Sequence, residues 1–346
     1  MVKDRNQFVD IMRGIAMLLV VLGHTMTGCT TGAEKSFLFN IVWSLQIPMF
    51  ILISGYVTRY SRGISDASGL WKYIKRRTIA YLLPWVVWSF LVRGIILGQS
   101  NFLNIQWLLW HMDFGYWFLA AIWTISVIFG ISTFTAKKIG KDSVIKQQVL
   151  TLILYVVGMA ILAGVSFFTG LSFFAIKLTL YYMPFYFAGY LYGQYREKIL
   201  ELKCGKTIID IMIICCLVGW IFIITRYHSY ALPDNGMAIV VRALCSITGC
   251  VAVCGLCKGL FTGTEKKLVG MAFLNWCGVH SLEIYLTHDL FLNLIKTKVL
   301  PSAESVQGVA MIAVNYIVTV ALVCVVVVLL NANKISRLIL FGNSKD

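Results

Sequence analysis

Residues 8–26 read FVDIMRGIAMLLVVLGHTM, a predominantly apolar run interrupted by Asp10, Arg13 and His24. A helix of this length reaches across the ~30 Å hydrocarbon core of a membrane. Because each residue turns a helix by about 100°, Arg13 and His24 share one face, roughly 16 Å apart along the axis. A charged group at bilayer depth costs about 2.5 kcal/mol or more. We therefore expect this face to line a polar cavity and not to contact lipid.

The composition indicates a polytopic membrane protein. The 346-residue chain is 59% hydrophobic and 13% charged, its mean hydropathy is +0.81, and soluble domains carry about 25% charged residues. Ten apolar stretches are each long enough to cross a bilayer. They are Phe8–Met26, Phe37–Val57, Ile79–Leu97, Tyr116–Phe134, Val149–Val165, Phe173–Tyr192, Ile208–Thr225, Met237–Cys257, Ala272–Ile295 and Val309–Leu330. The sequence predicts an all-α bundle of about ten transmembrane helices, forming one integral-membrane domain over residues 1–346.

The net charge of +15 would be compatible with nucleic-acid binding, but the distribution of the charge argues against it. When alternate loops are counted, 22 of the 30 Lys and Arg residues fall on one side, and only Lys35, Arg226, Lys296 and Lys298 fall on the other. The positive-inside rule then places both termini in the cytoplasm. We expect a multi-pass protein of the cell membrane with the lipid bilayer, and no nucleic acid, as a partner.

The ten cysteines do not form a metal-binding pattern. Cys250, Cys254 and Cys257 are close in sequence, but no His or carboxylate accompanies them and their surroundings are apolar. Cysteines of this kind are typically small packing residues. No metal site is predicted.

Several ionisable residues fall inside the predicted spans, mostly in the outer half. His24 and Glu283 lie too deep to reach the interface. His288 lies nearer the outer side than Glu283. Arg93 and Arg242 lie nearer to helix ends, where snorkelling to the interface is an alternative to a functional role.

Six motifs occur in an order that resembles the membrane acyltransferase 3 family, in particular its fucose 4-O-acetylase-like branch. The first combines FVDIMRGIA (8–16) with VVLGH (20–24), a basic residue and a histidine separated by ten positions. The others are IPMF with SGY (47–50, 54–56), KRR leading to YLLP (75–77, 81–84), YWFL (116–119), MPF with GY (183–185, 189–190) and SLEIYLTH (281–288). The resemblance covers nearly the whole chain. One position departs from it, because Gln46 stands where many relatives have a histidine and cannot titrate.

The resemblance implies an O-acyltransferase that moves an acyl group, expected to be acetyl, from cytoplasmic acyl-CoA to a hydroxyl of an extracytoplasmic saccharide or glycolipid. No tightly bound cofactor is implied. Imidazole, with a pKa near 6.5, suits a general base at neutral pH, and His24 is the candidate. Glu283 is its candidate partner if spans one and nine pack together. Preorganised donors for the oxyanion could come from Ser54, Trp117 and Tyr285.

The phosphates of the donor need cations on the inner side, and arginine binds phosphate in a bidentate manner. Candidates are Arg13, Lys75, Arg76 and Arg77. The alternatives are that the basic cluster only sets the topology and that Arg13 pairs with Asp10 one turn earlier. On the outer side, Trp117, His288, Arg93 and Arg242 are candidate contacts for the acceptor. Trp107 and Trp110 fit either a sugar contact or an interfacial aromatic belt.

Two other functions fit intramembrane Arg, Glu and His residues. A transporter would use them along a substrate or proton path, but the sequence has no internal repeat and no matching pair of spans broken by Gly or Pro. A non-catalytic sensor would keep the acyltransferase shape and bind a small ligand. Acetyl-CoA turnover would separate the sensor from the enzyme.

Overall fold

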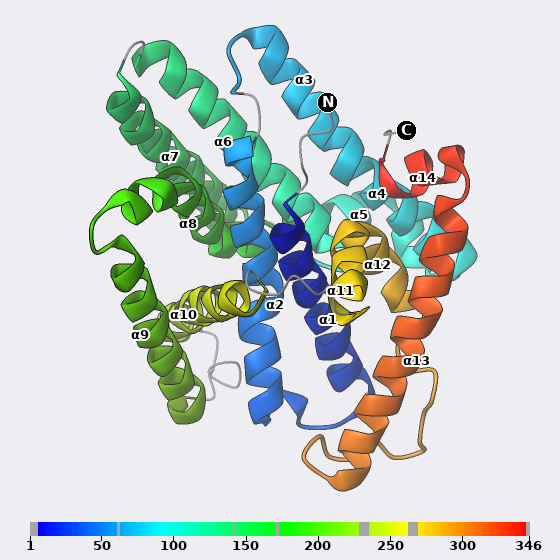
Figure 1. Cartoon of the computed structure of the whole chain (residues 1–346). Coiled ribbons are helices and arrows are strands. Elements are labelled where there is room, and N and C mark those ends of the chain that lie inside the picture. Colours follow the sequence, from blue (N-terminus) through cyan, green and yellow to red (C-terminus); the bar gives the residue numbers. More distant parts are fainter. Residues whose placement is uncertain are drawn as a thin grey trace. The chain divides into compact units, whose positions relative to one another are not determined.

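The computed structural model describes residues 6–60, 63–140, 143–170, 173–227, 235–261 and 269–343. These residues are mostly helical (Figure 1), and they contain no β-sheet, only an isolated bridge between Thr31 and Ser302. The predicted all-α class is confirmed.

Eight helical segments among the described residues are long and apolar enough to cross a membrane. They are Gln7–Cys29, Phe37–Tyr60, Ala67–Ile96, Trp117–Gly140, Val144–Thr169, Gly205–Tyr227, Gly236–Gly259 and Val306–Asn331. Each corresponds to one of the ten predicted spans, and together they confirm a multi-pass membrane protein.

The other two predicted spans differ from this pattern. The sixth lies in α8 (Ile176–Glu201), which is long enough to cross a membrane but is less apolar, since it carries many tyrosines and a charged C-terminal end. The ninth is not one helix. It consists of α11 (Val269–Val279), α12 (Ser281–Thr287) and the short turn η7 (His288–Leu290).

Local backbone geometry explains why the ninth span is interrupted. His280 has φ −101° and ψ 23°, which separates α11 from α12. Asn293, beyond η7, has φ 56°, a left-handed conformation that asparagine tolerates better than most residues. The predicted continuous helix to Ile295 is therefore wrong in its last part.

Several helices begin where a polar side chain caps them. Asn6, Ser36, Asp66 and Ser143 each accept a hydrogen bond from a backbone N–H in the first turn of the helix that follows. Such caps satisfy N–H groups that have no partner within the helix.

The structure divides into two compact units, and the first comprises Met1–Arg59 and Phe187–Leu329. It contains α1 (Gln7–Cys29), α2 (Phe37–Tyr56), α9 (Gly205–Tyr227), α10 (Gly236–Phe261), α11, α12 and nearly all of α13 (Val306–Asn331). In this unit α1 packs against α2, α11 and α12, and α9 pairs with α10 (Figure 1).

Two glycines permit the close packing of α1 on α11. A Cβ atom on Gly14 would lie 2.0 Å from the carbonyl oxygen of Leu274, and one on Gly278 would lie 1.7 Å from that of Asp10. Because both distances are shorter than any real contact, the two backbones can touch only where neither residue has a side chain.

The second unit comprises Tyr60–Tyr186 and Leu330–Asp346. Here α3 (Ala67–Arg77), η3 (Thr78–Leu82), α4 (Leu83–Val86) and η4 (Val87–Ile96) follow one another as a continuous helical rod. The unit also contains α5 (Ile105–Trp110), α6 (Trp117–Gly140), α7 (Val144–Thr169) and α14 (Lys334–Phe341), and α6 pairs with α7. Trp88 of η4 anchors α14, since its indole N–H donates to the carbonyl oxygen of Leu340 at 2.8 Å.

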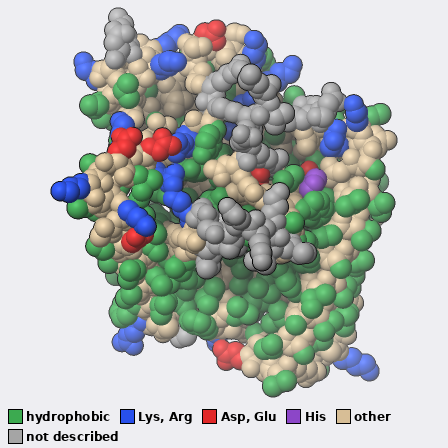
Figure 2. All heavy atoms as spheres, viewed as in Figure 1, with side chains coloured by type: hydrophobic (Ala, Val, Ile, Leu, Met, Phe, Trp, Pro, Cys, Tyr) green, Lys and Arg blue, Asp and Glu red, His purple; other side chains and the backbone are tan. Residues whose placement is uncertain are grey.

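Large apolar side chains are exposed along the predicted spans. Ile214 and Val218 of α9, Ile317 of α13 and Ile153 of α7 are all exposed. Hydrophobic side chains cover much of the face shown in Figure 2. Exposed apolar surface of this extent is typical of a protein whose solvent is lipid.

Candidate active site

The first part of the candidate site lies near the start of α1. Asp10 is buried, and its carboxylate lies 3.8 Å from the guanidinium of Arg13, whose side chain is 26% exposed. The spacing of three residues places both on one face of the helix. The predicted pairing of Arg13 with Asp10 is confirmed, and the partial exposure of Arg13 leaves it accessible to a ligand.

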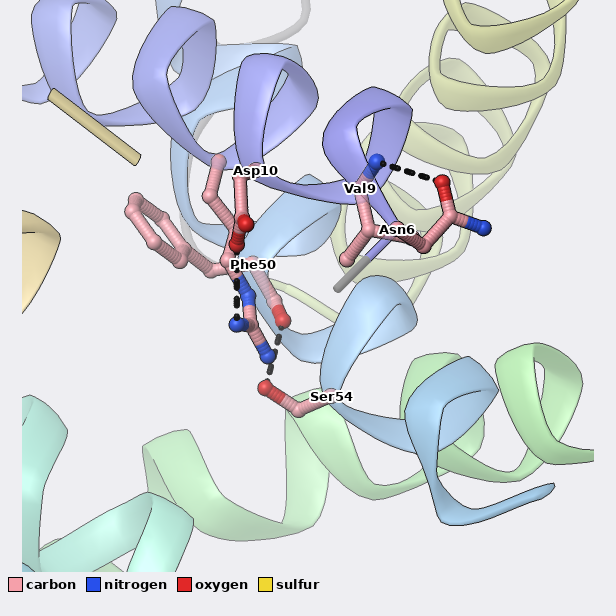
Figure 3. Close-up of polar contacts among 6 residues, drawn as sticks. Asn6, Val9, Asp10, Phe50 and Ser54 are labelled. Atoms are coloured by element: carbon pink, nitrogen blue, oxygen red, sulfur yellow. Dashed lines mark hydrogen bonds and ion pairs between the residues drawn. The ribbon is translucent and has the colours of Figure 1, made fainter. Parts of the chain in front are cut away.

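Ser54 of α2 lies close to this pair. Figure 3 shows Asp10 of α1 facing Phe50 and Ser54 of α2. The hydroxyl of Ser54 donates to the carbonyl oxygen of Phe50 at 2.8 Å. To act as an oxyanion donor, as predicted, Ser54 would have to rotate away from this bond.

The second part of the candidate site lies near the other end of α1. The rings of His24 and His288 have centroids 5.3 Å apart, and Trp43 of α2 meets His24 edge-on at 6.1 Å. His24 is half-buried and His288 is buried. Two of the predicted site residues, 264 positions apart in sequence (288 − 24), are therefore neighbours.

The backbone fixes the tautomer of His288. Its Nδ1 lies 2.6 Å from the carbonyl oxygen of Tyr285. Since a carbonyl oxygen can only accept, Nδ1 carries the hydrogen, and in the neutral ring Nε2 is then an acceptor. Tyr285 itself is buried, and its ring lies 5.8 Å from that of His288.

A constant register shows that α1 runs parallel to the segment from the start of α11 to Asn293. Gly14 faces Gly278, His24 faces His288, and Gly28 faces Asn293, whose Nδ2 is 1.7 Å from where a Cβ on Gly28 would lie. Each residue of the later segment is numbered 264 or 265 higher than its partner (278 − 14, 288 − 24, 293 − 28). The packing of predicted spans one and nine is confirmed.

Glu283 lies in α12 between these contact points, but the structure gives it a different neighbour. It is 5% exposed, and its Oε1 lies 3.6 Å from Nδ1 of His280. Among the described residues it does not come within ion-pair distance of His24. No role was predicted for His280, although its spacing of three residues from Glu283 is visible in the sequence.

Gln46, the position that departs from the family pattern, packs against α1 at Gly23, the residue before His24. It is 3% exposed, and its Oε1 lies 2.8 Å from where a Cβ on Gly23 would be. No hydrogen-bond partner for this oxygen is found in the described part of the chain. A buried acceptor without a partner, at the turn of α1 that carries His24, could accept a hydrogen bond from a ligand hydroxyl.

The remaining candidate of this unit is Arg242. It lies half-buried in α10.

The second unit contains the other predicted residues. Lys75 and Arg76 are exposed, whereas Arg77 turns inward, with Nη1 donating to the hydroxyl of Tyr81 at 3.1 Å. Arg93 lies over the rings of Phe102 and Tyr116, at 5.3 and 5.1 Å.

The aromatic candidates of this unit stack on neighbours. Trp117 stacks on Tyr182, with ring centroids 5.7 Å apart, and Trp107 stacks on His111 at 4.7 Å. Stacked rings of this kind fit a carbohydrate platform, and they also fit an interfacial belt.

One comparison with known proteins gives a match. The profile of a family described as an acyltransferase domain, acyltransferase 3, matches residues 6–331. No curated protein and no solved structure gives a match. The matched range includes all the predicted site residues.

Proposed function

The chain belongs to the acyltransferase 3 family, and from this premise we propose that it transfers an acetyl group from cytoplasmic acetyl-CoA to a hydroxyl of an extracytoplasmic or lipid-linked saccharide. The family assignment makes the protein a membrane acyltransferase. The donor, the acceptor, the cell membrane as its location and the roles of individual residues are our proposal.

In the proposed reaction His24 is the general base. It takes the proton from the acceptor hydroxyl as the oxygen attacks the thioester carbonyl. The carbon–sulfur bond then breaks, and the thiolate leaves and takes up the proton. The observation that supports this role best is the contact of His24 with His288 at 5.3 Å, because it places a second hydrogen-bonding imidazole beside the proposed base.

The donor site is proposed near the inner ends of the spans. In the first unit, Arg13 is 26% exposed near the start of α1. In the second unit, Lys75, Arg76 and Arg77 form the last turn of α3, and Lys75 and Arg76 are exposed. Each unit thus offers cations of the kind that bind the phosphates of a coenzyme A thioester.

The acceptor site is proposed on the outer side. His288 and Tyr285 adjoin His24 in the first unit, and Arg242 is the further candidate there. Considered separately, the second unit has Arg93 and Trp117 as proposed acceptor contacts, a cation and a ring face. Glu283 is proposed to act through His280, its neighbour in the structure, and Ser54 remains a proposed oxyanion donor.

The test uses purified full-length protein in lipid with radiolabelled acetyl-CoA. Consumption of acetyl-CoA, with label transferred to water or to an added saccharide, supports the proposal. A folded protein that neither binds nor consumes acetyl-CoA would contradict it and favour a transporter or a sensor.

Arg13→Ala is expected to weaken donor binding, with the KM for acetyl-CoA rising by about tenfold or more, because a charged hydrogen bond contributes about 1.5–3 kcal/mol. The substitution also removes the ion pair between Arg13 and the buried carboxylate of Asp10, which is expected to lower the stability of the protein. The variant Asp10→Asn/Arg13→Ala separates the two effects. We expect it to restore the melting temperature but not the KM.

Arg226→Ala is the matched control, since Arg226 is exposed on α9 and has no proposed role. If the double variant recovered both stability and donor affinity, Arg13 would have only a structural function.

A further inference from the structure

The last helix, α14, lies beyond residues 6–331, the range that matches the family profile. It packs on α4 and η4 of the second unit (Figure 1). Asn333 has an extended backbone, with φ −111° and ψ 131°, and α13 ends two residues earlier at Asn331. α14 is therefore a separate short helix and not a continuation of the last span.

Contacts within the second unit fix which face of α14 turns inward. Phe341 is 1% exposed and stacks on Trp88, with ring centroids 6.3 Å apart. The indole N–H of Trp88 donates to the carbonyl oxygen of Leu340 at 2.8 Å. A Cβ on Gly342 would lie 2.1 Å from the carbonyl oxygen of Ile79. The C-terminal end of α14 therefore packs closely against the rod that contains η3, α4 and η4.

The contact with Ile79 also indicates the depth of α14 in the membrane. Ile79 is the first residue of the third predicted span and follows the basic last turn of α3. A span begins where the chain enters the hydrocarbon core, so a helix packed at residue 79 lies near the boundary between headgroups and acyl chains. The positive-inside rule places this boundary on the cytoplasmic side.

The face of α14 that points away from these contacts is apolar. Ile335, Leu338 and Ile339 are spaced by three and four residues, which places them on one side of the helix. They are 68%, 39% and 44% exposed. An exposed apolar face on a helix at the membrane boundary fits contact with the acyl chains of lipids.

Two cations lie beside this apolar face. Lys334 and Arg337 are three residues apart and are therefore neighbours on the helix surface, and α14 contains no acidic residue. Lys334 is exposed and Arg337 is half-buried. Among the described residues, the buried Nε of Arg337 has no hydrogen-bond partner, and no carboxylate lies within ion-pair distance of its guanidinium. Because charges removed from water are normally paired, this arginine favours an added anion.

The combination of cations and apolar face indicates the kind of partner. A soluble phosphate compound such as coenzyme A would pair with the cations but would leave the apolar face in water. A neutral lipid would cover the apolar face but would bring no anion to Arg337. An anionic phospholipid has both a charged headgroup and acyl chains, and such lipids give the cytoplasmic leaflet its negative surface potential.

We propose that α14 binds an anionic phospholipid at the cytoplasmic surface of the membrane. Arg337 and Lys334 contact the phosphate of the headgroup. The acyl chains contact Ile335, Leu338 and Ile339. Since a ligand that binds only the folded protein stabilises it, the bound lipid also raises the melting temperature. This site does not depend on the proposed acyl transfer.

The experiment makes two measurements on full-length protein. Retention of phosphatidylglycerol relative to phosphatidylcholine is measured by native mass spectrometry after extraction from mixed vesicles. The melting temperature is measured in nanodiscs of phosphatidylcholine with and without phosphatidylglycerol. Arg337→Gln removes the charge, and its matched control is Lys138→Gln, an exposed cation in the last turn of α6 in the same unit. Ile335→Asn changes the apolar face, and its matched control is Ile145→Asn, since Ile145 is 74% exposed near the start of α7.

Arg337→Gln is expected to lower the ratio of retained phosphatidylglycerol to phosphatidylcholine by about fivefold or more, which corresponds to about 1 kcal/mol for one cation at an anionic membrane surface. The rise in melting temperature with phosphatidylglycerol should be largely lost in the same variant. Ile335→Asn should lower the retention of phosphatidylglycerol by about threefold, the effect of about one CH₂ group withdrawn from apolar contact. Both controls should stay within twofold of wild type, because they lie away from α14. If Arg337→Gln does not fold, Lys334→Gln is judged by the same criterion.

An unchanged ratio of the two lipids in folded Arg337→Gln would overturn the proposal. An equal loss in Lys138→Gln would also overturn it, because it would indicate a general effect of surface charge. Binding of coenzyme A is measured calorimetrically in nanodiscs of phosphatidylcholine as a further comparison. Weaker binding of coenzyme A in Arg337→Gln, with unchanged retention of phosphatidylglycerol, would assign Arg337 to the donor site and contradict the lipid site.

Discussion

His24→Ala is expected to lower acetyl transfer by at least about 100-fold, the usual contribution of a positioned general base. The substitution removes the group that would take the hydroxyl proton. Folding should be retained, because His24 is only half-buried and lies beside the buried ring of His288. The measurement is single-turnover transfer of label from acetyl-CoA in lipid, with the melting temperature recorded on the same preparation.

His228→Ala is the matched control, since the same side chain is removed at a position that has no proposed role and lies outside the described residues. His24→Gln adds a second comparison, because it keeps a hydrogen-bonding group but cannot take up a proton. Near-normal turnover in His24→Ala, or full activity in His24→Gln, would remove His24 from proton transfer.

The sequence was sufficient to predict the features that depend on one helix. The depth of His24 and the pairing of Arg13 with Asp10 follow from helical periodicity in a single apolar run, and the structure confirms the pairing. The eight long apolar spans were also predictable, because a bilayer imposes a minimum length on every spanning helix.

Features that depend on the packing of two helices could be predicted only conditionally, because the sequence does not show which helices are neighbours or in what register. Periodicity places Arg76 and Arg77 about 100° apart on α3, but it does not say which of them faces Tyr73 and Tyr81. Likewise, the proximity of His24 and His288 requires the parallel register of α1 with α11 and α12. That register depends on glycine contacts between segments 264 residues apart (278 − 14).

The break at His280 illustrates a third limit. An apolar run such as Ala272–Ile295 predicts a continuous helix by hydropathy, but hydropathy does not report backbone conformation. At this interruption α11 ends and α12 begins, and His280 lies beside Glu283. A carboxylate predicted to serve His24 therefore has a nearer imidazole.

Gly278→Ala is expected to lower the stability of the protein by about 3 kcal/mol or more, at the upper end of the cost of overpacking. The added Cβ would lie 1.7 Å from the carbonyl oxygen of Asp10. Because that atom belongs to the backbone of α1, no side-chain rotation can relieve the overlap, and α11 has to move away from α1. The measurement is the thermal melting temperature of the purified protein in detergent, together with acetyl transfer.

Gly270→Ala is the matched control on the same helix, since a Cβ on Gly270 would meet no atom within 4 Å. It should be neutral or stabilising by about 0.5–1 kcal/mol, because alanine favours a helix over glycine. Equal melting temperatures for the two variants would contradict the close packing of α1 on α11. If Gly278→Ala is destabilised as expected and its folded fraction also loses activity, the close packing of α1 on α11 contributes to function as well as to stability. The reason is that the same register that brings Gly14 to Gly278 also brings His24 to His288.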